Sequence, residues 1–234
     1  MDKTGDIWRK ICDTYGITDI TAFRRMTKLR IEMTEASVAM ICMHKTDFLP
    51  ALEALLSSCG EAELTEDDAM GTNAIMWAAA GYLTFEKLSV LERLHPDFIR
   101  AHIRDADSDG WTPLHYLAGS GEDRPESVKF LVDRGVDIDA RCFAYGRTAL
   151  HEFAAKQTEA ERSVARLLDY EPELYCDKEG DDPMWTEFRF SGRVDEYNAY
   201  EGSGLIIKYT HTSGKKVHPY RPVGRTGRRG NKNR

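Results

Sequence analysis

Two histidines lie in nearly identical surroundings and are the residues of this chain best suited to chemistry. His115 ends the run Gly-Trp-Thr-Pro-Leu-His, and His151 ends the run Gly-Arg-Thr-Ala-Leu-His 36 residues later. A histidine can bind a metal or transfer protons near neutral pH. His151-Glu152 matches half of the zinc-binding pattern His-Glu-x-x-His, but Ala155 occupies the place of the second histidine. The pattern therefore predicts no catalytic residue and no metal site at His151.

The other acidic and nucleophilic residues form no recognisable catalytic pattern. Asp181-Asp182 and the run 66–68 are typical of solvated loops, and no Ser/His/Asp or Cys/His arrangement follows from the sequence. The five cysteines are odd in number and contain no Cys-x-x-Cys pair. This favours reduced thiols in the cytoplasm, with the nucleus as the alternative, over disulfides or zinc. We therefore expect a protein that is not an enzyme and has no cofactor.

The size and composition are those of an ordinary globular protein, whereas the charge is unevenly distributed. The chain has 234 residues, of which 41% are hydrophobic and 30% charged. Its apolar runs are far shorter than a membrane span, and its start lacks the features of a secretory signal, so we expect no membrane partner. From Lys208 onward there are nine Lys or Arg residues and no Asp or Glu. Because the whole chain has a net charge of −7, residues 1–207 carry −16.

The repeated run has residue types that suit the start of a helix. Each copy supplies a glycine, a threonine, a leucine and a histidine, namely Gly110, Thr112, Leu114 and His115, then Gly146, Thr148, Leu150 and His151. Glycine permits a positive φ in a turn, and a threonine hydroxyl can cap a helix. Pro113 suits the first helical turn, where no backbone donor is needed. The leucines are predicted to begin a buried stripe.

This Gly-x-Thr-x-Leu-His motif, at a period near 33 residues, resembles the ankyrin repeat. The resemblance implies an all-α solenoid, and it implies that His115 and His151 bond loop backbone in a structural role. About four repeats are predicted over residues 33–67, 68–106, 107–142 and 143–175. An N-terminal helical cap is predicted at 1–32. The motif spacings of 36 and 39 residues predict small insertions in loops.

The outer repeats are degenerate. Asn73 replaces the threonine in the second repeat, whose second helix is predicted from about Thr84 to Leu94. The first repeat is weaker, with a buried stripe predicted between Phe48 and Leu56. These patterns keep a helical spacing of apolar residues even where the motif is lost.

After residue 175 the helical periodicity stops. Residues 176–219 are predicted as a linker and a short, partly extended appendage. The polar run 177–183 has the composition of a linker, and strands are predicted around Trp185, Phe188 and Phe190 and at 205–209. Residues 220–234 are predicted as a basic disordered tail. The sequence leaves open whether the appendage packs on the fourth repeat, for which Trp185 and Phe188 are the natural residues.

The C-terminal segment also resembles the region before the catalytic core of Nudix-type ADP-ribose pyrophosphatases. The likeness rests on Val194-Asp195, Tyr200-Glu-Gly202 and the run Pro-Val-Gly-Arg-Thr-Gly-Arg-Arg-Gly at 222–230. No Nudix box follows, so this resemblance implies the targeting half of an ankyrin–Nudix fusion, truncated and inactive as supplied. It is the alternative to a binding scaffold.

The binding hypothesis places a protein partner on the concave surface of hairpin tips and inner-helix ends. The residues predicted to contact it are Met70, Thr72, Ser108, Asp109, Trp111, Tyr145, Arg147 and Lys156. Trp111, Tyr145 and Arg147 belong to the residue types that dominate interface energetics. The competing interpretation is that Trp111 packs on an adjacent hairpin. No small-molecule substrate is indicated.

The basic tail 220–234 offers a second, less favoured partner. Its Lys and Arg residues could contact phosphates of nucleic acid. No stacking platform or nucleic-acid-binding module accompanies them, and the acidic body competes for the same charges. The sequence therefore favours a protein partner over nucleic acid.

Overall fold

The computed structural model describes residues 39, 43–44, 47, 49–65, 70–156, 160–183, 185–186, 206, 209 and 212–222. The N-terminal cap predicted at 1–32 lies outside these residues. So do Phe188, Phe190 and the tail from Val223 onward, together with most of the segment that resembles Nudix enzymes.

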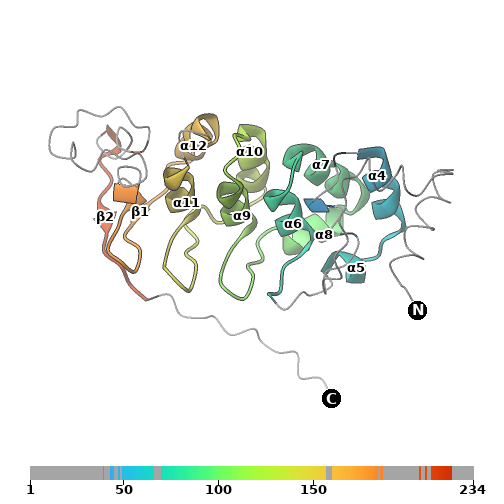
Figure 1. Ribbon diagram of the computed structural model, residues 1–234, viewed down its shortest axis with the longest axis horizontal. Coiled ribbons are helices and arrows are strands. Elements are labelled where there is room, and N and C mark those ends of the chain that lie inside the picture. Colours follow the sequence, from blue (N-terminus) through green and yellow to red (C-terminus); the bar gives the residue numbers. More distant parts are fainter. Residues whose placement is uncertain are drawn as a thin grey trace, which may run out of the picture.

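Successive pairs of helices stand side by side in an elongated stack (Figure 1). The inner row contains α6 (Ala74–Ala80), α9 (Pro113–Ser120) and α11 (Ala149–Ala155). The outer row contains α7 (Thr84–Leu94), α10 (Pro125–Asp133) and α12 (Glu161–Leu168). Two further helices, α4 (Leu49–Ser58) and α5 (Glu61–Thr65), precede them. Long hairpin loops project past the inner row. The predicted all-helical repeat solenoid is confirmed.

Each inner helix begins at a residue whose side chain caps it. Asn73 accepts hydrogen bonds from the backbone N–H groups of Ile75 and Met76, at 3.0 and 3.2 Å. Thr112 and Thr148 form capping boxes with the histidine three residues later. These contacts satisfy backbone donors that have no partner within the helix. The same local chemistry therefore sets the start of α6, α9 and α11.

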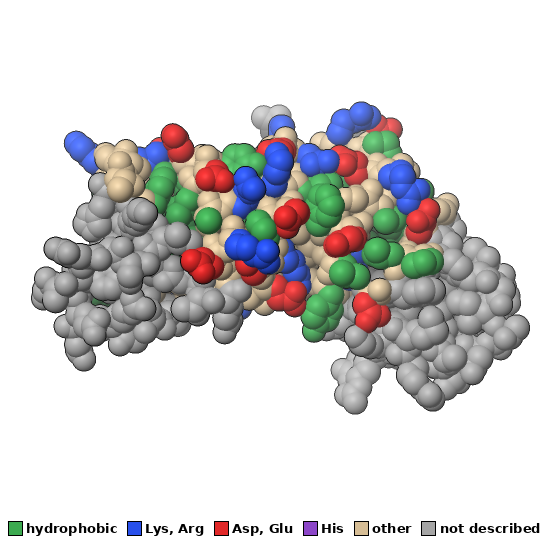
Figure 2. Space-filling view, turned by 90° about the horizontal axis from the view of Figure 1, so that it is seen from above, with side chains coloured by type: hydrophobic (Ala, Val, Ile, Leu, Met, Phe, Trp, Pro, Cys, Tyr) green, Lys and Arg blue, Asp and Glu red, His purple; other side chains and the backbone are tan. Residues whose placement is uncertain are grey.

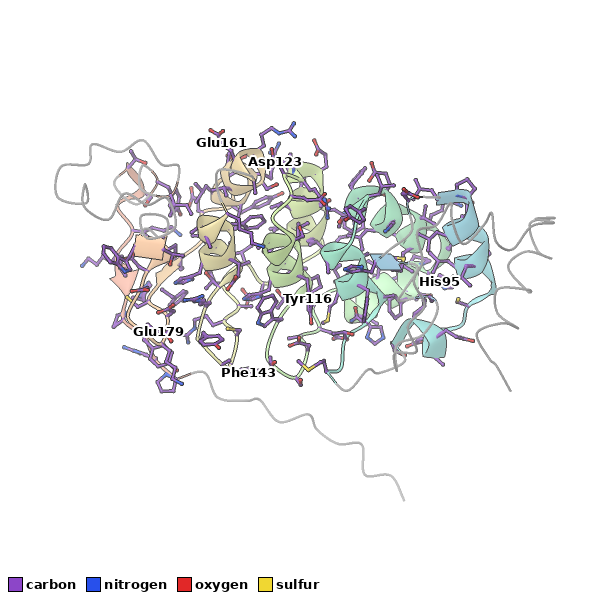
Figure 3. All side chains as sticks on the ribbon, in the orientation of Figure 1. His95, Tyr116, Asp123, Phe143, Glu161 and Glu179 are labelled. Atoms are coloured by element: carbon purple, nitrogen blue, oxygen red, sulfur yellow. The ribbon has the colours of Figure 1, made fainter. Side chains whose placement is uncertain are left out.

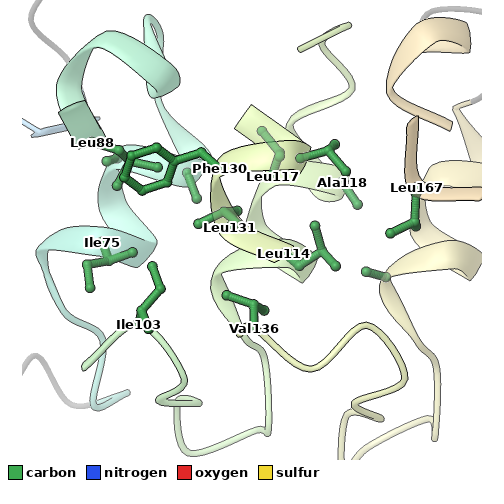
Figure 4. Close-up of a cluster of buried hydrophobic side chains, with 14 of the residues drawn as sticks. Ile75, Leu88, Ile103, Leu114, Leu117, Ala118, Phe130, Leu131, Val136 and Leu167 are labelled. Atoms are coloured by element: carbon green, nitrogen blue, oxygen red, sulfur yellow. The ribbon is translucent and has the colours of Figure 1, made fainter. Parts of the chain in front are cut away.

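A continuous apolar core runs along the stack between the two rows (Figure 4). Ile75, Leu114 and Leu150 occupy equivalent places, two residues after the cap, and all three are fully buried. Small residues such as Ala78 and Ala118 let neighbouring inner helices approach closely. Truncating one of these leucines to alanine would cost about 2–5 kcal/mol, so the stack holds together chiefly through this core.

The extra residues of the second repeat form a helix rather than a loop. Helix α8 (Pro96–His102) follows α7 after a single residue, with Pro96 in its first turn. Phe98 and Ile99 on α8 are buried in the core. The prediction of a loop insertion is therefore wrong for this repeat, because the inserted residues carry an apolar face of their own.

The predicted linker at Asp177–Pro183 instead forms a hairpin like that of the third repeat. The Asp177 N–H donates to the Asp181 carbonyl at 2.8 Å, just as the Asp107 N–H donates to the Trp111 carbonyl at 3.0 Å. Asp182 then caps a helical turn by accepting from the Trp185 N–H at 2.8 Å. The linker prediction is wrong because a polar run can build a hairpin through its aspartates without apolar residues.

The strands expected in the appendage lie elsewhere in the chain. Trp185, Ile206 and Tyr209 are helical, so those strand predictions are wrong at the described positions. The observed strands are β1 (Leu174–Tyr175) and β2 (Val217–His218), which pair in parallel.

The C-terminal segment packs against the last hairpins. Tyr209 donates to the Pro172 carbonyl at 2.9 Å, and Arg141 donates to the Arg221 carbonyl at 3.1 Å. The ring of Tyr220 lies over Gly146, where a Cβ atom would come within 2.6 Å of it. The first residues of the segment predicted as a disordered tail are therefore held against the fourth repeat.

On the outer row, polar contacts join each repeat to the next. Arg93 forms an ion pair with Glu53 at 2.9 Å, and the Arg134 guanidinium donates two hydrogen bonds of 2.6 Å to the Glu92 carboxylate. Seen from above the stack, acidic and basic side chains are interspersed over the described residues (Figure 2). Exposed pairs of this kind contribute little individually. The mixed charge gives this face no dominant sign that would select a partner.

Candidate protein-binding surface

The hairpin tips are joined in a ladder of backbone hydrogen bonds. The Ser108 N–H donates to the Met70 carbonyl, the Phe143 N–H to the Asp109 carbonyl and the Lys178 N–H to the Tyr145 carbonyl, each at 2.7 Å. Figure 3 shows Phe143 and Glu179 at the ends of successive hairpins. The ladder places the predicted tip residues in neighbouring hairpins along one edge of the stack.

Asp107 fixes the third hairpin to its inner helix, and sequence reasoning missed it. One carboxylate oxygen accepts the N–H groups of Asp109 and Trp111 at 2.9 and 2.8 Å, and the other accepts the Tyr116 hydroxyl at 2.6 Å. Asp107 is only 5% exposed. A signal was present, because aspartate four residues before Trp111 is a typical turn residue.

Three residues occupy the same place on successive inner helices. Trp77, Tyr116 and Glu152 each lie four residues after the helix cap, and each is partly exposed. Figure 3 shows Tyr116 on the hairpin side of α9. These three residues and the hairpin tips at Met70, Ser108, Asp109 and Tyr145 form one surface, which we call the concave surface. Sequence reasoning did not select Trp77, Tyr116 or Glu152 as contacts.

An apolar pocket of about 210 Å³ opens on one half of this surface. Its lining residues come from the first three repeats and are His44, Met70, Thr72, Met76, Trp77, Ala80 and Tyr116. The Trp77 indole N–H donates to the Thr72 hydroxyl at 2.6 Å, and its ring meets the His44 ring edge-on at 5.7 Å. These contacts hold the indole in one orientation. Of the residues predicted to bind, Met70 and Thr72 belong to this pocket.

The Trp111 side chain packs along its own inner helix. Its ring is 5.5 Å from that of Tyr116 and 5.8 Å from that of His115. A Cβ atom at Gly119 would lie 3.3 Å from Cζ3 of Trp111. Among the described residues, its ring contacts do not include Tyr145. Trp111 and Tyr145, the two aromatic residues predicted as joint anchors, therefore make no ring contact with each other in the described structure.

The other half of the concave surface is charged. Arg147 Nε donates to Asp177 at 2.9 Å, and this aspartate is fully buried. The Tyr145 side chain is 52% exposed, with the Arg147 guanidinium 5.6 Å from its ring centre. Lys156 reaches back to the Gly119 carbonyl of the preceding repeat. Tyr145 and Arg147, both predicted to bind the partner, therefore lie together, but Arg147 is already bonded to an internal partner.

Glu152 is a partly buried carboxylate in this charged half. Burial raises the pKa of its carboxyl above the ordinary value, while the nearby Arg147 and Lys156 oppose the shift. Its carboxylate makes no hydrogen bond or ion pair with any residue that the structure describes. A carboxylate held in this state gains from a cation brought by a ligand.

The two motif histidines join neighbouring repeats. In His115, Nδ1 accepts the Thr112 N–H at 3.2 Å and Nε2 donates to the Arg147 carbonyl at 3.1 Å. In His151, Nδ1 accepts the Thr148 N–H at 3.1 Å and Nε2 donates to the Asp181 carbonyl at 3.2 Å. Burial lowers the pKa of each ring to about 4. Both rings are therefore neutral at pH 7, with each nitrogen already occupied.

Two negative findings concern the described part of the chain. There, no group of three or more His, Cys, Asp or Glu side chains is arranged to hold a metal ion. No helix in that part is long and apolar enough to cross a membrane.

The capping boxes, paired helices and hairpin ladder agree with a comparison against known families. Residues 38–142 match the family described as ankyrin repeats (3 copies). No curated protein matches the chain significantly. The hairpin at 177–181 lies beyond the matched segment, yet it repeats the hydrogen bonds of the hairpin at 107–111. Residues 38–142 therefore form a set of ankyrin repeats.

Proposed function

We propose that this protein is a non-catalytic scaffold that binds a protein partner through its concave surface. The observation that carries the proposal is the apolar pocket between Met70, Trp77 and Tyr116. A pocket lined by aromatic and methionine side chains, next to exposed tips, is typical of the centre of a protein interface. Ankyrin repeats are protein-interaction modules, which supports the same role.

We propose Trp77 and Tyr116, in place of Trp111, as the main aromatic contacts of the partner. Trp77 and Tyr116 form the walls of the pocket, whereas Trp111 is packed on α9. Met70 and Tyr145 remain the exposed apolar tips, at 40% and 52%. We propose that the pocket receives one apolar side chain of the partner and that the two tips contact the flanking chain.

We also propose that this binding takes place in the cytoplasm. Cys59, Cys142 and Cys176 are free thiols in the described part of the chain. Free thiols are typical of a reducing compartment, which supports this placement.

Affinity capture from extracts of the producing cells tests the surface. The double variant Met70→Ser/Tyr145→Ser removes both tips. The matched control is Tyr82→Ser/Phe85→Ser, whose residues are similarly exposed at 54% and 41% but lie at the start of the outer row. We expect one protein recovered by the wild type to be lost with the tip variant and kept with the control. Equal recovery with both variants would contradict the proposed surface.

A further inference from the structure

In the charged half of the concave surface, as far as the structure describes the chain, the basic side chains have internal partners and two of the acidic side chains do not. Its two cations have partners, because Arg147 is bonded to the buried Asp177 and Lys156 to the Gly119 carbonyl. Glu152 and Asp109 have no side-chain hydrogen bond or ion pair with the described residues. The unmet charge on this half is therefore negative, and a basic group of a partner would complement it.

The pocket and Glu152 are separated by a defined span. The pocket lies between α6 and α9, and Glu152 projects from α11, the next helix of the inner row. Packed helix axes are about 8–10 Å apart, so the two features are separated by about 10–15 Å. An extended chain advances about 3.3 Å per residue, so this span corresponds to about three or four residues.

We propose that the concave surface binds an extended protein segment that carries an apolar side chain and a Lys or Arg three or four residues away. The apolar side chain enters the pocket beside Trp77 and Tyr116, and the basic group pairs with Glu152. This inference rests on the proposed function and adds the chemistry of the partner to it.

The volume and polarity of the pocket fit this occupant. A cavity of about 150 Å³ lined by apolar residues can hold a benzene molecule, so about 210 Å³ accommodates a leucine or phenylalanine side chain. The two cations would attract an acidic segment only after losing their internal bonds. Because Arg147 would leave Asp177 buried and unpaired, an acidic partner is disfavoured.

Peptide selection tests the proposal with random sequences in place of a partner protein. Random twelve-residue peptides displayed on phage are selected on the immobilised full chain. The recovered peptides are then synthesised, together with versions in which the basic residue is replaced by glutamate. Their dissociation constants are measured by fluorescence anisotropy on the wild type, Glu152→Lys and the control Glu126→Lys. Glu126 is exposed on the outer helix α10, so the control makes the same charge change on another face.

We expect the selected peptides to share an apolar residue with Lys or Arg three or four positions away. Glu152→Lys should weaken their binding about tenfold and should strengthen binding of the glutamate versions. Glu126→Lys should leave both unchanged. Failure to recover any binder, or equal binding of basic peptides by the wild type and Glu152→Lys, would overturn the proposal.

A further variant separates this inference from the proposed function. Ala80 lines the pocket at the end of α6, so Ala80→Gln fills the pocket from a partly exposed position. If Ala80→Gln weakens peptide binding but Glu152→Lys leaves it unchanged, only the proposed need for a Lys or Arg in the partner would be overturned. Peptides indifferent to Ala80→Gln and to the tip variant would overturn the proposed surface itself.

Discussion

The two halves of the concave surface are built on the same scaffold yet present different chemistry. The half at α6 and α9 offers Trp77 and Tyr116 around an apolar pocket, whereas the half at α11 offers the carboxylate of Glu152 beside Arg147. Trp77, Tyr116 and Glu152 each lie four residues after the cap of their helix. The repeat therefore fixes where a side chain stands, and the residue type at that place decides what it can bind.

Both halves of the concave surface depend on a buried histidine, so protonating these rings should have the largest effect on stability. In the folded chain the pKa of His115 and His151 is about 4, below the usual 6.5. Between pH 4 and pH 6.5 the unfolded chain therefore binds protons at these two histidines that the folded chain does not bind. Stability present above pH 6.5 is lost as the pH falls toward 4, by about 3 kcal/mol per histidine. Urea unfolding followed by circular dichroism at pH 7 and pH 5 should show about 2 kcal/mol of this loss per histidine.

Glutamine at the same positions provides the control for the pH effect. Gln keeps a side chain able to complete the capping box but does not titrate. His115→Gln and His151→Gln should each remove about half of the pH dependence. An unchanged pH dependence in both variants would contradict the assignment of neutral, buried rings.

The aspartates that hold the hairpins of the two halves should contribute unequally to stability. Asp177→Ala removes a turn and leaves Arg147 without its carboxylate, so we expect the free energy of unfolding to fall by about 3 kcal/mol. Asp107→Ala removes a similar turn, but the side-chain bond that it breaks is to the neutral Tyr116 hydroxyl, so a smaller loss of about 2 kcal/mol is expected. Chemical denaturation of both variants measures the difference. A larger loss for Asp107→Ala would show that the Arg147–Asp177 pair does not stabilise the charged half.

A smaller effect is expected from Tyr116→Phe in the apolar half. The change removes the bond between the Tyr116 hydroxyl and Asp107 while keeping the ring at the pocket wall. The expected loss of stability is about 1 kcal/mol, as for a single hydrogen bond. Thermal and urea unfolding measure it, and unchanged stability would indicate that the bond does not hold the hairpin to α9.

The smallest effect on stability is expected from Glu152→Gln, and it has the opposite sign. Because burial raises the pKa of Glu152, its ionised form destabilises the fold at neutral pH. Removing the charge should therefore raise stability, by less than about 1 kcal/mol, while weakening binding of basic peptides. Glu126→Gln on the outer row is the matched control and should change neither quantity. A loss of stability in Glu152→Gln would contradict the view that this carboxylate serves binding.

Sequence reasoning found the repeats wherever the helix-capping chemistry was explicit. Thr112 with His115 and Thr148 with His151 specify local contacts within three residues, so the motif alone predicts them. The hairpin at Asp177 escaped because Asp182 replaces the threonine and Trp185 the histidine. Its signal was the spacing Asp-x-x-Gly, which occurs at 107–110 and again 70 residues later at 177–180.

The candidate site was predicted less completely than the fold. Tips such as Met70 and Tyr145 follow from the motif because they precede a glycine of the turn. The pocket needed tertiary information, since it forms only where residues of three repeats meet. Counting four residues from each cap would have singled out Tyr116. It could not have shown that Arg147 is already paired, because its partner Asp177 comes from the hairpin that was missed.

Photo-crosslinking in the producing cells tests the central claim, that a protein docks on the concave surface, most directly. Benzoylphenylalanine is placed at Met70, at Tyr145 and, as the control, at Tyr82, which are all exposed. The account predicts a covalent adduct with the same protein from positions 70 and 145 and none from position 82. An adduct from position 82 alone, or none from either tip, would contradict it.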